Sequence, residues 1–132
     1  YYSPITFLYW YDLPNVYKGE KELDFWTYCP TVWDESKALA GEIGEYIIQA
    51  RRTGNDWFVG AMNGLQARDI TLNTADFLQK GKKYRVEIYN DDPSLQTRTK
   101  VSSTVVNVKA GKQLKLHLQA SGGAALRFVP VR

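Results

Sequence analysis

Hydrophobic and polar residues alternate at every second position through most of the chain beyond residue 30. In residues 83–88, Tyr84, Val86 and Ile88 alternate with lysine, arginine and glutamate. The same alternation recurs in residues 46–51, 57–61 and 114–119. Because successive side chains of a β-strand point to opposite faces, this period predicts half-buried strands.

Weaker patterns of the same kind, bounded by turn residues, complete the set of predicted strands. They fall at residues 38–41, 69–73, 99–108 and 125–131, and residues 74–78 favour a helical turn. Turns are predicted at residues 53–56, 81–82, 91–93, 110–111 and 121–123, which are rich in glycine, aspartate and serine. No intervening segment is long enough for a crossover helix. Residues 31–132 are therefore predicted to form an all-β domain, an antiparallel two-sheet β-sandwich of about eight strands.

Residues 1–30 follow a different pattern, dense in large aromatic side chains. Residues 20–28 predict a short helix, with acidic residues in its first turn, Gly19 before it and Pro30 after it. This segment has more aromatic surface than two short helices can bury against each other, so it needs a partner surface. Since the sequence begins at Tyr1 rather than methionine, we expect it to start within a longer protein.

Charge and hydropathy exclude two classes of function. Seventeen Lys and Arg against fourteen Asp and Glu give a net charge of +3, but the basic residues are scattered. The basic groove with interleaved aromatics that single-stranded nucleic acid needs is missing, so no nucleic-acid partner is predicted. The sequence holds no apolar run of about 18 residues, so no membrane span is predicted.

Acidic pairs are the first candidates for catalysis, because glycoside hydrolysis needs two carboxyl groups, about 5 to 9.5 Å apart, across a sugar. The candidates are Asp34 with Glu35, Glu42 with Glu45, and Asp91 with Asp92. Neighbouring residues of a strand point to opposite faces, so the first pair converges only if a turn intervenes. All of these acids are otherwise interpreted as solvated or turn-forming residues.

Other reactive groups are sparse. Cys29 and His117 are the only cysteine and histidine, and no third group is spaced to orient a Cys–His pair. A buried structural thiol is the favoured interpretation of Cys29. Metal-ligand spacings, nucleophile elbows and phosphate-binding loops are absent from the sequence.

The four tryptophans leave two interpretations open. In the first, Trp57 and exposed tyrosines stack on sugar rings, as the aromatic platforms of carbohydrate-binding modules do. The aromatics near the start of the sequence instead favour packing between domains or between copies of the chain. The residues assigned to such packing are Tyr9, Trp10, Phe25, Trp26 and Trp33.

Residues 27–64 resemble the C-terminal region of family 97 glycoside hydrolases, the α-glucosidases and α-galactosidases found largely in Bacteroidetes. The features that carry the resemblance are PTVWDE at residues 30–35, GEIGEY at 41–46, ARR at 50–52 and WFVGA at 57–61. Upstream, FLYWY at residues 7–11 looks like the end of the family's catalytic barrel, and downstream GGAA at 122–125 looks like a late sandwich strand. Residues 61–65 depart from it, since a more polar loop is expected there.

The resemblance implies a parent enzyme with an N-terminal β-sandwich, a central (β/α)₈ barrel and this C-terminal sandwich. Residues 1–30 would be the last part of the barrel, and residues 31–132 the accessory domain. In this family the catalytic carboxylates and the calcium site lie in the barrel, so no catalytic residue, metal ligand or cofactor is expected in this chain. The resemblance further implies a periplasmic or envelope location, the parent's barrel as a partner, an α-linked oligosaccharide as the parent's substrate, and homo-oligomer contacts.

The aromatic residues of the first segment also predict association. Burying a large apolar side chain is worth about 1.5 to 3 kcal/mol, so several such residues exposed together favour pairing of chains. We expect the helical lead-in to pack on its own sandwich, and the remaining barrel-facing aromatics to make a contact between chains. The residues concerned are Phe7, Leu8, Tyr9, Trp10, Tyr11, Phe25 and Trp26.

Overall fold

The computed structural model describes residues 13–131, which form two short 3₁₀ turns, one short helix and eight strands. The helical elements are η1 (Pro14–Val16), α1 (Leu23–Tyr28) and η2 (Thr74–Asp76). The strands are β1 (Glu35–Glu42), β2 (Tyr46–Thr53), β3 (Asp56–Asn63), β4 (Arg68–Asn73), β5 (Lys83–Asp91), β6 (Val101–Lys109), β7 (Gln113–Leu118) and β8 (Gly123–Val131).

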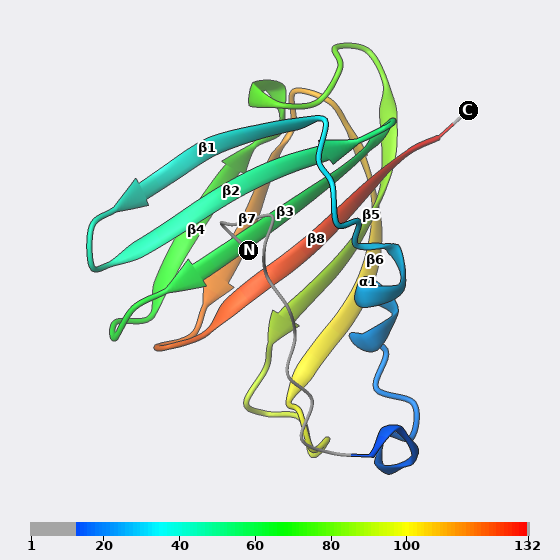
Figure 1. Cartoon of the computed structure of the whole chain (residues 1–132). Coiled ribbons are helices and arrows are strands. Elements are labelled where there is room, and N and C mark those ends of the chain that lie inside the picture. Colours follow the sequence, from blue (N-terminus) through cyan, green and yellow to red (C-terminus); the bar gives the residue numbers. More distant parts are fainter. Residues whose placement is uncertain (1–12, 132) are drawn as a thin grey trace.

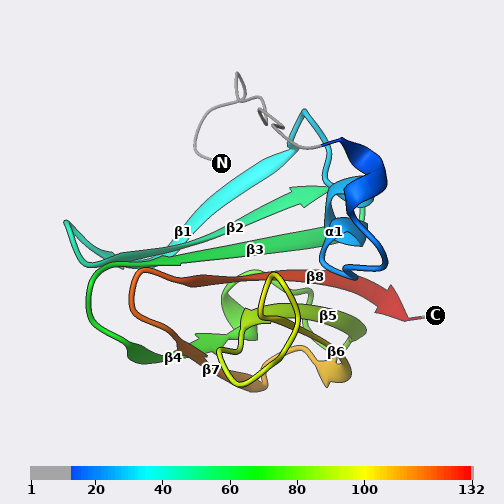
Figure 2. The ribbon, with the colours of Figure 1, turned by 90° about the horizontal axis from the view of Figure 1, so that it is seen from below.

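The strands form two antiparallel sheets, as the alternation predicts. The larger sheet has the order β1-β2-β3-β8-β5-β6, and the smaller sheet pairs β4 with β7. The smaller sheet covers one face of the larger sheet, here called the inner face, and α1 lies on the other, here called the outer face (Figures 1 and 2). The predicted antiparallel sandwich is confirmed.

Local turn chemistry fixes the register of the β2–β3 hairpin. Thr53 pairs with Asp56, so the loop has only two residues, and its first residue, Gly54, has φ of +54°. Glycine occupies this left-handed backbone conformation without the steric cost that a side chain would add. Residues 61–65, where the sequence departs from the family pattern, lie where the chain changes sheet. Strand β3 of the larger sheet ends at Asn63, and the next strand, β4, belongs to the smaller sheet.

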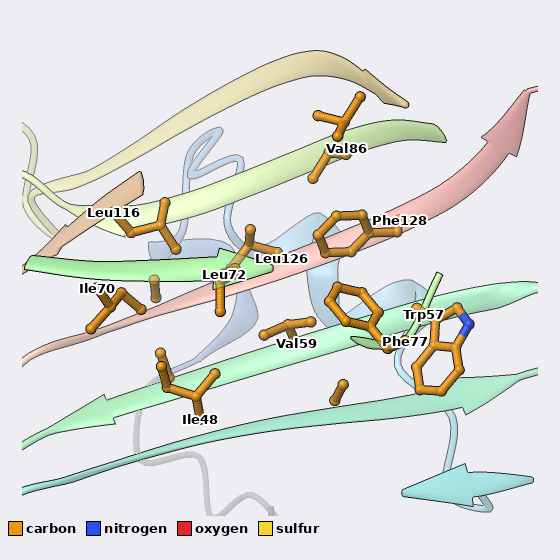
Figure 3. Packing of buried hydrophobic residues seen from close by; sticks show 14 of the residues in the cluster. Ile48, Trp57, Val59, Ile70, Leu72, Phe77, Val86, Leu116, Leu126 and Phe128 are labelled. Atoms are coloured by element: carbon orange, nitrogen blue, oxygen red, sulfur yellow. The ribbon is translucent and has the colours of Figure 1, made fainter. Parts of the chain in front are cut away.

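The hydrophobic core lies between the inner face and the smaller sheet (Figure 3). Val59, Leu126 and Phe128 from the larger sheet meet Leu72 and other apolar residues of β4 and β7. The segment after η2 closes one end of the core with Phe77, whose ring packs edge-on against Trp57 and Phe128 at centroid distances of 5.5 and 5.1 Å.

The helix is shorter than the predicted residues 20–28, since residues 21–22 form a turn and only Leu23–Tyr28 are helical. Its Phe25 ring lies edge-on to Phe58 of β3 at 5.7 Å and to Tyr89 of β5 at 5.8 Å. The helix of the lead-in therefore packs on its own sandwich, as predicted, while Phe7, Leu8 and Tyr11 lie outside the described residues.

Candidate functional site

A largely apolar groove lies between α1 and the outer face. We call it the aromatic groove. It has a volume of about 210 Å³ and is lined chiefly by Phe25, Trp26, Cys29, Trp33, Phe58 and Met62, with Gln49, Arg51, Val59, Gly60 and Ala125 completing its walls. Its lining comes from α1, from the segment that leads to β1, and from β2, β3 and β8.

Edge-to-face aromatic contacts hold the groove in shape. The ring of Trp33 lies 5.3 Å from that of Phe58, and Phe25 lies 6.2 Å from Trp26. The Arg51 guanidinium lies 5.7 Å from the Trp33 ring and is the one charged group of the lining. Trp26 keeps 39% of its surface exposed. A hollow of this kind can bind an apolar side chain of a partner. Its lining contains no carboxylate that could act as a catalytic acid or base.

A charged cluster beside the groove fixes α1 on the sheet. Arg127 of β8 donates to Asp56 Oδ2 at 2.8 Å and lies 3.6 Å from Glu87 Oε2, while Arg85 also pairs with Glu87. The Arg127 guanidinium stacks on Tyr28 at 3.8 Å from the ring centre. Because Arg127 and Glu87 are largely buried, this cluster locks β3, β8, β5 and α1 together.

Cys29 and His117 do not meet. Cys29 lines the aromatic groove, where desolvation by burial raises the pKa of its thiol. His117 lies on the exposed side of the smaller sheet, with Nδ1 2.7 Å from Asp69 Oδ1. The thiol is on the outer face of the larger sheet and the imidazole is beyond its inner face, so the two form no catalytic pair.

The acidic residues near β1 serve the fold. The Gly54 amide donates to Asp34 Oδ2 at 2.7 Å, and both Asp34 and Glu35 pair with Arg52. The hydrogen bond from Arg52, followed by that from Lys37, lowers the pKa of Glu35. The chain bends at Asp34, just before β1, and this bend lets both carboxylates contact the same guanidinium. Convergence of this pair was predicted only if such a turn intervened.

The other acidic candidates have structural partners or lie apart. Arg68 donates to Glu45 at 2.6 Å, and Asp91 accepts from the Gly123 amide at 2.7 Å. Asp92 accepts from the Ser94 amide at 3.0 Å, as turn-forming aspartates do. Glu42 is exposed at the end of β1. This arrangement supports the interpretation of these acids as turn-forming and solvated residues.

Trp57 does not have the environment of a sugar platform. Its side chain is only 5% exposed, within the core, and packs on Phe77. Lys37 Nζ and the Arg52 guanidinium lie 5.3 and 6.0 Å from its ring centre. A stacking platform needs an open ring face, so the structure does not support the carbohydrate-binding interpretation of Trp57.

Three of the aromatics predicted for packing, Phe25, Trp26 and Trp33, come together at the groove. Tyr9 and Trp10 lie outside the described residues. Phe58 was not predicted from the sequence, although Trp57, Phe58 and Val59 are three consecutive apolar residues. Such a run marks a strand buried on both faces, and Phe58 is the member that faces α1.

Within residues 13–131 no group of three or more His, Cys, Asp or Glu side chains is placed to hold a metal ion. None of the helices described for this chain is long and apolar enough to cross a membrane.

Comparison with known proteins identifies the family. Residues 32–129 match the family described as "Glycosyl-hydrolase 97 C-terminal, oligomerisation". The chain is 37% identical over 119 residues, 89% of its length, to a retaining alpha-galactosidase of Bacteroides thetaiotaomicron, of which it covers 18%.

Solved structures agree with this. A glycoside hydrolase family 97 enzyme from Pseudoalteromonas sp. strain K8, in complex with panose, superposes with a TM-score of 0.80 and 35% identity over 92% of this chain and 20% of that one. A beta-arabinopyranosidase gives a TM-score of 0.66 and 30% identity over 89% of this chain and 17% of that one. The chain thus spans about a fifth of the length of these relatives. It belongs to the glycosyl-hydrolase 97 C-terminal oligomerisation family and is a non-catalytic accessory domain of these enzymes.

Proposed function

We propose that this chain supports a parent glycoside hydrolase that cleaves α-linked galactosides or glucosides. The relatives support this, because one is named a retaining alpha-galactosidase and solved structures show a family 97 enzyme in complex with panose and with acarbose. In this proposal residues 1–30 are the end of the catalytic barrel and residues 31–132 the sandwich. The family match begins at residue 32, which supports that boundary.

The observation that carries the accessory role is the aromatic groove. It offers apolar rings from α1 and the sheet, with Trp26 and Met62 still 39% and 58% exposed, at the point where the chain enters the sandwich. We assign the rest of the catalytic barrel, upstream of α1, as the partner that covers this groove, since the barrel precedes the domain in the proposed parent. Covering exposed apolar surface of this kind stabilises a contact between domains.

The remaining properties of the parent follow from the same assignment. The calcium ion is assigned to the barrel, because that is where the family resemblance implies it. A periplasmic or envelope location is proposed from the resemblance to Bacteroidetes enzymes.

Enzyme assays test the proposed function. The complete parent and the 132-residue chain are compared on p-nitrophenyl α-galactoside and α-glucoside. We expect hydrolysis by the parent on at least one substrate and none above buffer background by the chain. Hydrolysis by the isolated chain would disprove the accessory role, and a parent inactive on both substrates would disprove the proposed substrate class.

A further inference from the structure

The larger sheet has two edge strands, β1 and β6, and their chemistry differs. β1 carries charges at Glu35, Lys37 and Glu42, and its register with β2 shifts between Ala38 and Ala40. Charged side chains and bulges of this kind prevent an edge strand from pairing with another chain. The β1 edge is therefore protected.

β6 lacks this protection. It pairs with β5 over nine residues without a register shift, from Val101 opposite Asp91 to Lys109 opposite Lys83. Its sequence, VSSTVVNVK, is uncharged up to the last residue, has no proline or glycine, and is rich in β-branched residues. No described strand pairs with its other side. A regular, neutral edge with unpaired backbone groups is a template for strand addition.

The exposed part of β6 is symmetric about its middle. Residues 103–107 are all exposed, with Val105 and Val106 at 53% and 38%. Val105 lies on the outer face, since it pairs with Glu87, and Val106 lies on the inner face opposite Val86. At one end Ser102 and Ser103 border a hollow shared with residues 18–22, and at the other Val108 is buried. The accessible edge is thus centred on Val105.

We propose that two copies of this chain pair antiparallel through their β6 edges, across a twofold axis at Val105. The proposal rests on the assembly role of the domain, which its family description names. A twofold axis perpendicular to the sheet places the central residue of one strand opposite the same residue of the other copy. Residues that lie opposite each other in an antiparallel pair are on the same face of the sheet. Val105 then faces Val105, and Thr104 faces Val106, on both sides of the axis.

This pairing brings no like charges together and extends two six-stranded sheets into one continuous sheet. The β-branched pairs at its centre are those that stabilise neighbouring strands. Self-pairing of β1 would place its charges and its bulge in the ladder instead. The difference between the two edges is what selects β6.

Analytical ultracentrifugation of the 132-residue chain over a concentration series tests the proposal. We expect the wild type to dimerise, and Val105→Lys and Val105→Glu to raise the dimer dissociation constant at least about tenfold, because like charges would face each other across the axis. Mixing the two variants should restore a dimer. Ala38→Lys on the β1 edge and Trp26→Ser in the aromatic groove are the controls, and both should dimerise like the wild type.

Disulfide trapping provides a second readout that does not depend on weakening a contact. Paired residues of an antiparallel ladder have Cα atoms about 4.5 to 5.5 Å apart, within the range of a disulfide. In a Cys29→Ser background, Val105→Cys should cross-link into a covalent dimer under mild oxidation, and Ala38→Cys should not.

The outcomes separate the alternatives. A dimer that persists in Val105→Lys, or that is lost in Trp26→Ser instead, overturns the β6 pairing, as does a failure of Val105→Cys to cross-link. A wild type that stays monomeric overturns it too. The proposed function is tested separately, by the hydrolysis assays on the parent, and none of these variants is used there. A failure of the β6 pairing is therefore distinguishable from a failure of the proposed function.

Discussion

Thr74 shows how one buried hydroxyl organises two loops. Its side chain is fully buried, donates to the Lys112 carbonyl at 2.6 Å and accepts from the Gly111 amide at 3.0 Å. Its backbone amide also donates to Lys112 O at 3.2 Å. The start of η2 is therefore tied to the β6–β7 turn, 37 residues further along the chain.

Replacing this hydroxyl should cost stability. Thr74→Val keeps the shape of the side chain but leaves the Gly111 amide and the Lys112 carbonyl without that partner. Leaving a buried polar group unsatisfied costs about 1 to 3 kcal/mol, so we expect the free energy of unfolding to fall by that amount. Urea denaturation measures it. The control is Thr71→Val on the exposed side of β4, where a change within about 0.5 kcal/mol is expected.

Two glycines of the larger sheet should respond in opposite ways to alanine. A Cβ on Gly123 would lie 2.4 Å from the Ala61 carbonyl oxygen, a backbone atom, whereas a Cβ on Gly60 would meet nothing within 4 Å. We expect Gly123→Ala to destabilise the fold by at least about 1 kcal/mol, since strands β3 and β8 must move apart. Gly60→Ala should be neutral or stabilising by up to about 1 kcal/mol, because it restricts the unfolded chain. Equal melting temperatures for the two variants would contradict this.

At the scale of the element, Arg127 connects α1 to three strands. Arg127→Met would leave Asp56 without this cation, would remove one of two partners of Glu87, and would remove the stacking on Tyr28. Breaking a largely buried pair costs about 3 to 5 kcal/mol, and the partial exposure here reduces our expectation to about 2 to 4 kcal/mol. Arg127→Lys should lose less, about 1 to 2 kcal/mol, because the charge remains while the planar stacking goes.

Urea unfolding followed by tryptophan fluorescence measures these changes, and Trp26 of α1 is one of the four tryptophans that contribute to the signal. Arg98→Met is the matched control, since Arg98 pairs with Glu20 at 3.7 Å and is itself about half exposed. Surface pairs contribute about 0 to 1 kcal/mol. If both variants lost the same stability, the Arg127 cluster would not be what holds the helix.

Sequence alone predicted the elements better than their partners. The period of two located all eight strands, because alternation is a local consequence of one buried face, as in residues 83–88. It could not predict that β3 pairs with β8, more than 60 residues away, since pairing depends on contacts across the whole chain. Likewise the assignment of Phe25, Trp26 and Trp33 to packing between domains or copies stays a prediction. Phe58, whose ring contacts Phe25 and Trp33, was not predicted from the sequence.

At the scale of the whole molecule, the two faces of the larger sheet contact different elements. The inner face holds the core with the smaller sheet, whereas the outer face holds α1 and the aromatic groove. The catalytic barrel is assigned to the groove and a second copy to the β6 edge. These two surfaces share no lining residue, since the groove is lined from α1, the segment before β1, β2, β3 and β8, whereas β6 is an edge strand.

The reactivity of Cys29 tests whether the barrel covers the groove. Burial raises the pKa of this thiol, so at pH 7 to 8 it stays protonated and should react slowly with a disulfide reagent even in the isolated chain. In the complete parent we expect the rate to fall at least about tenfold further, because a partner that fills the groove closes access to the thiol. The control is His117→Cys in a Cys29→Ser background, whose thiol would lie on the exposed side of the smaller sheet and should react at similar rates in chain and parent. Cys29 reacting equally fast in both would show that the barrel leaves the aromatic groove open.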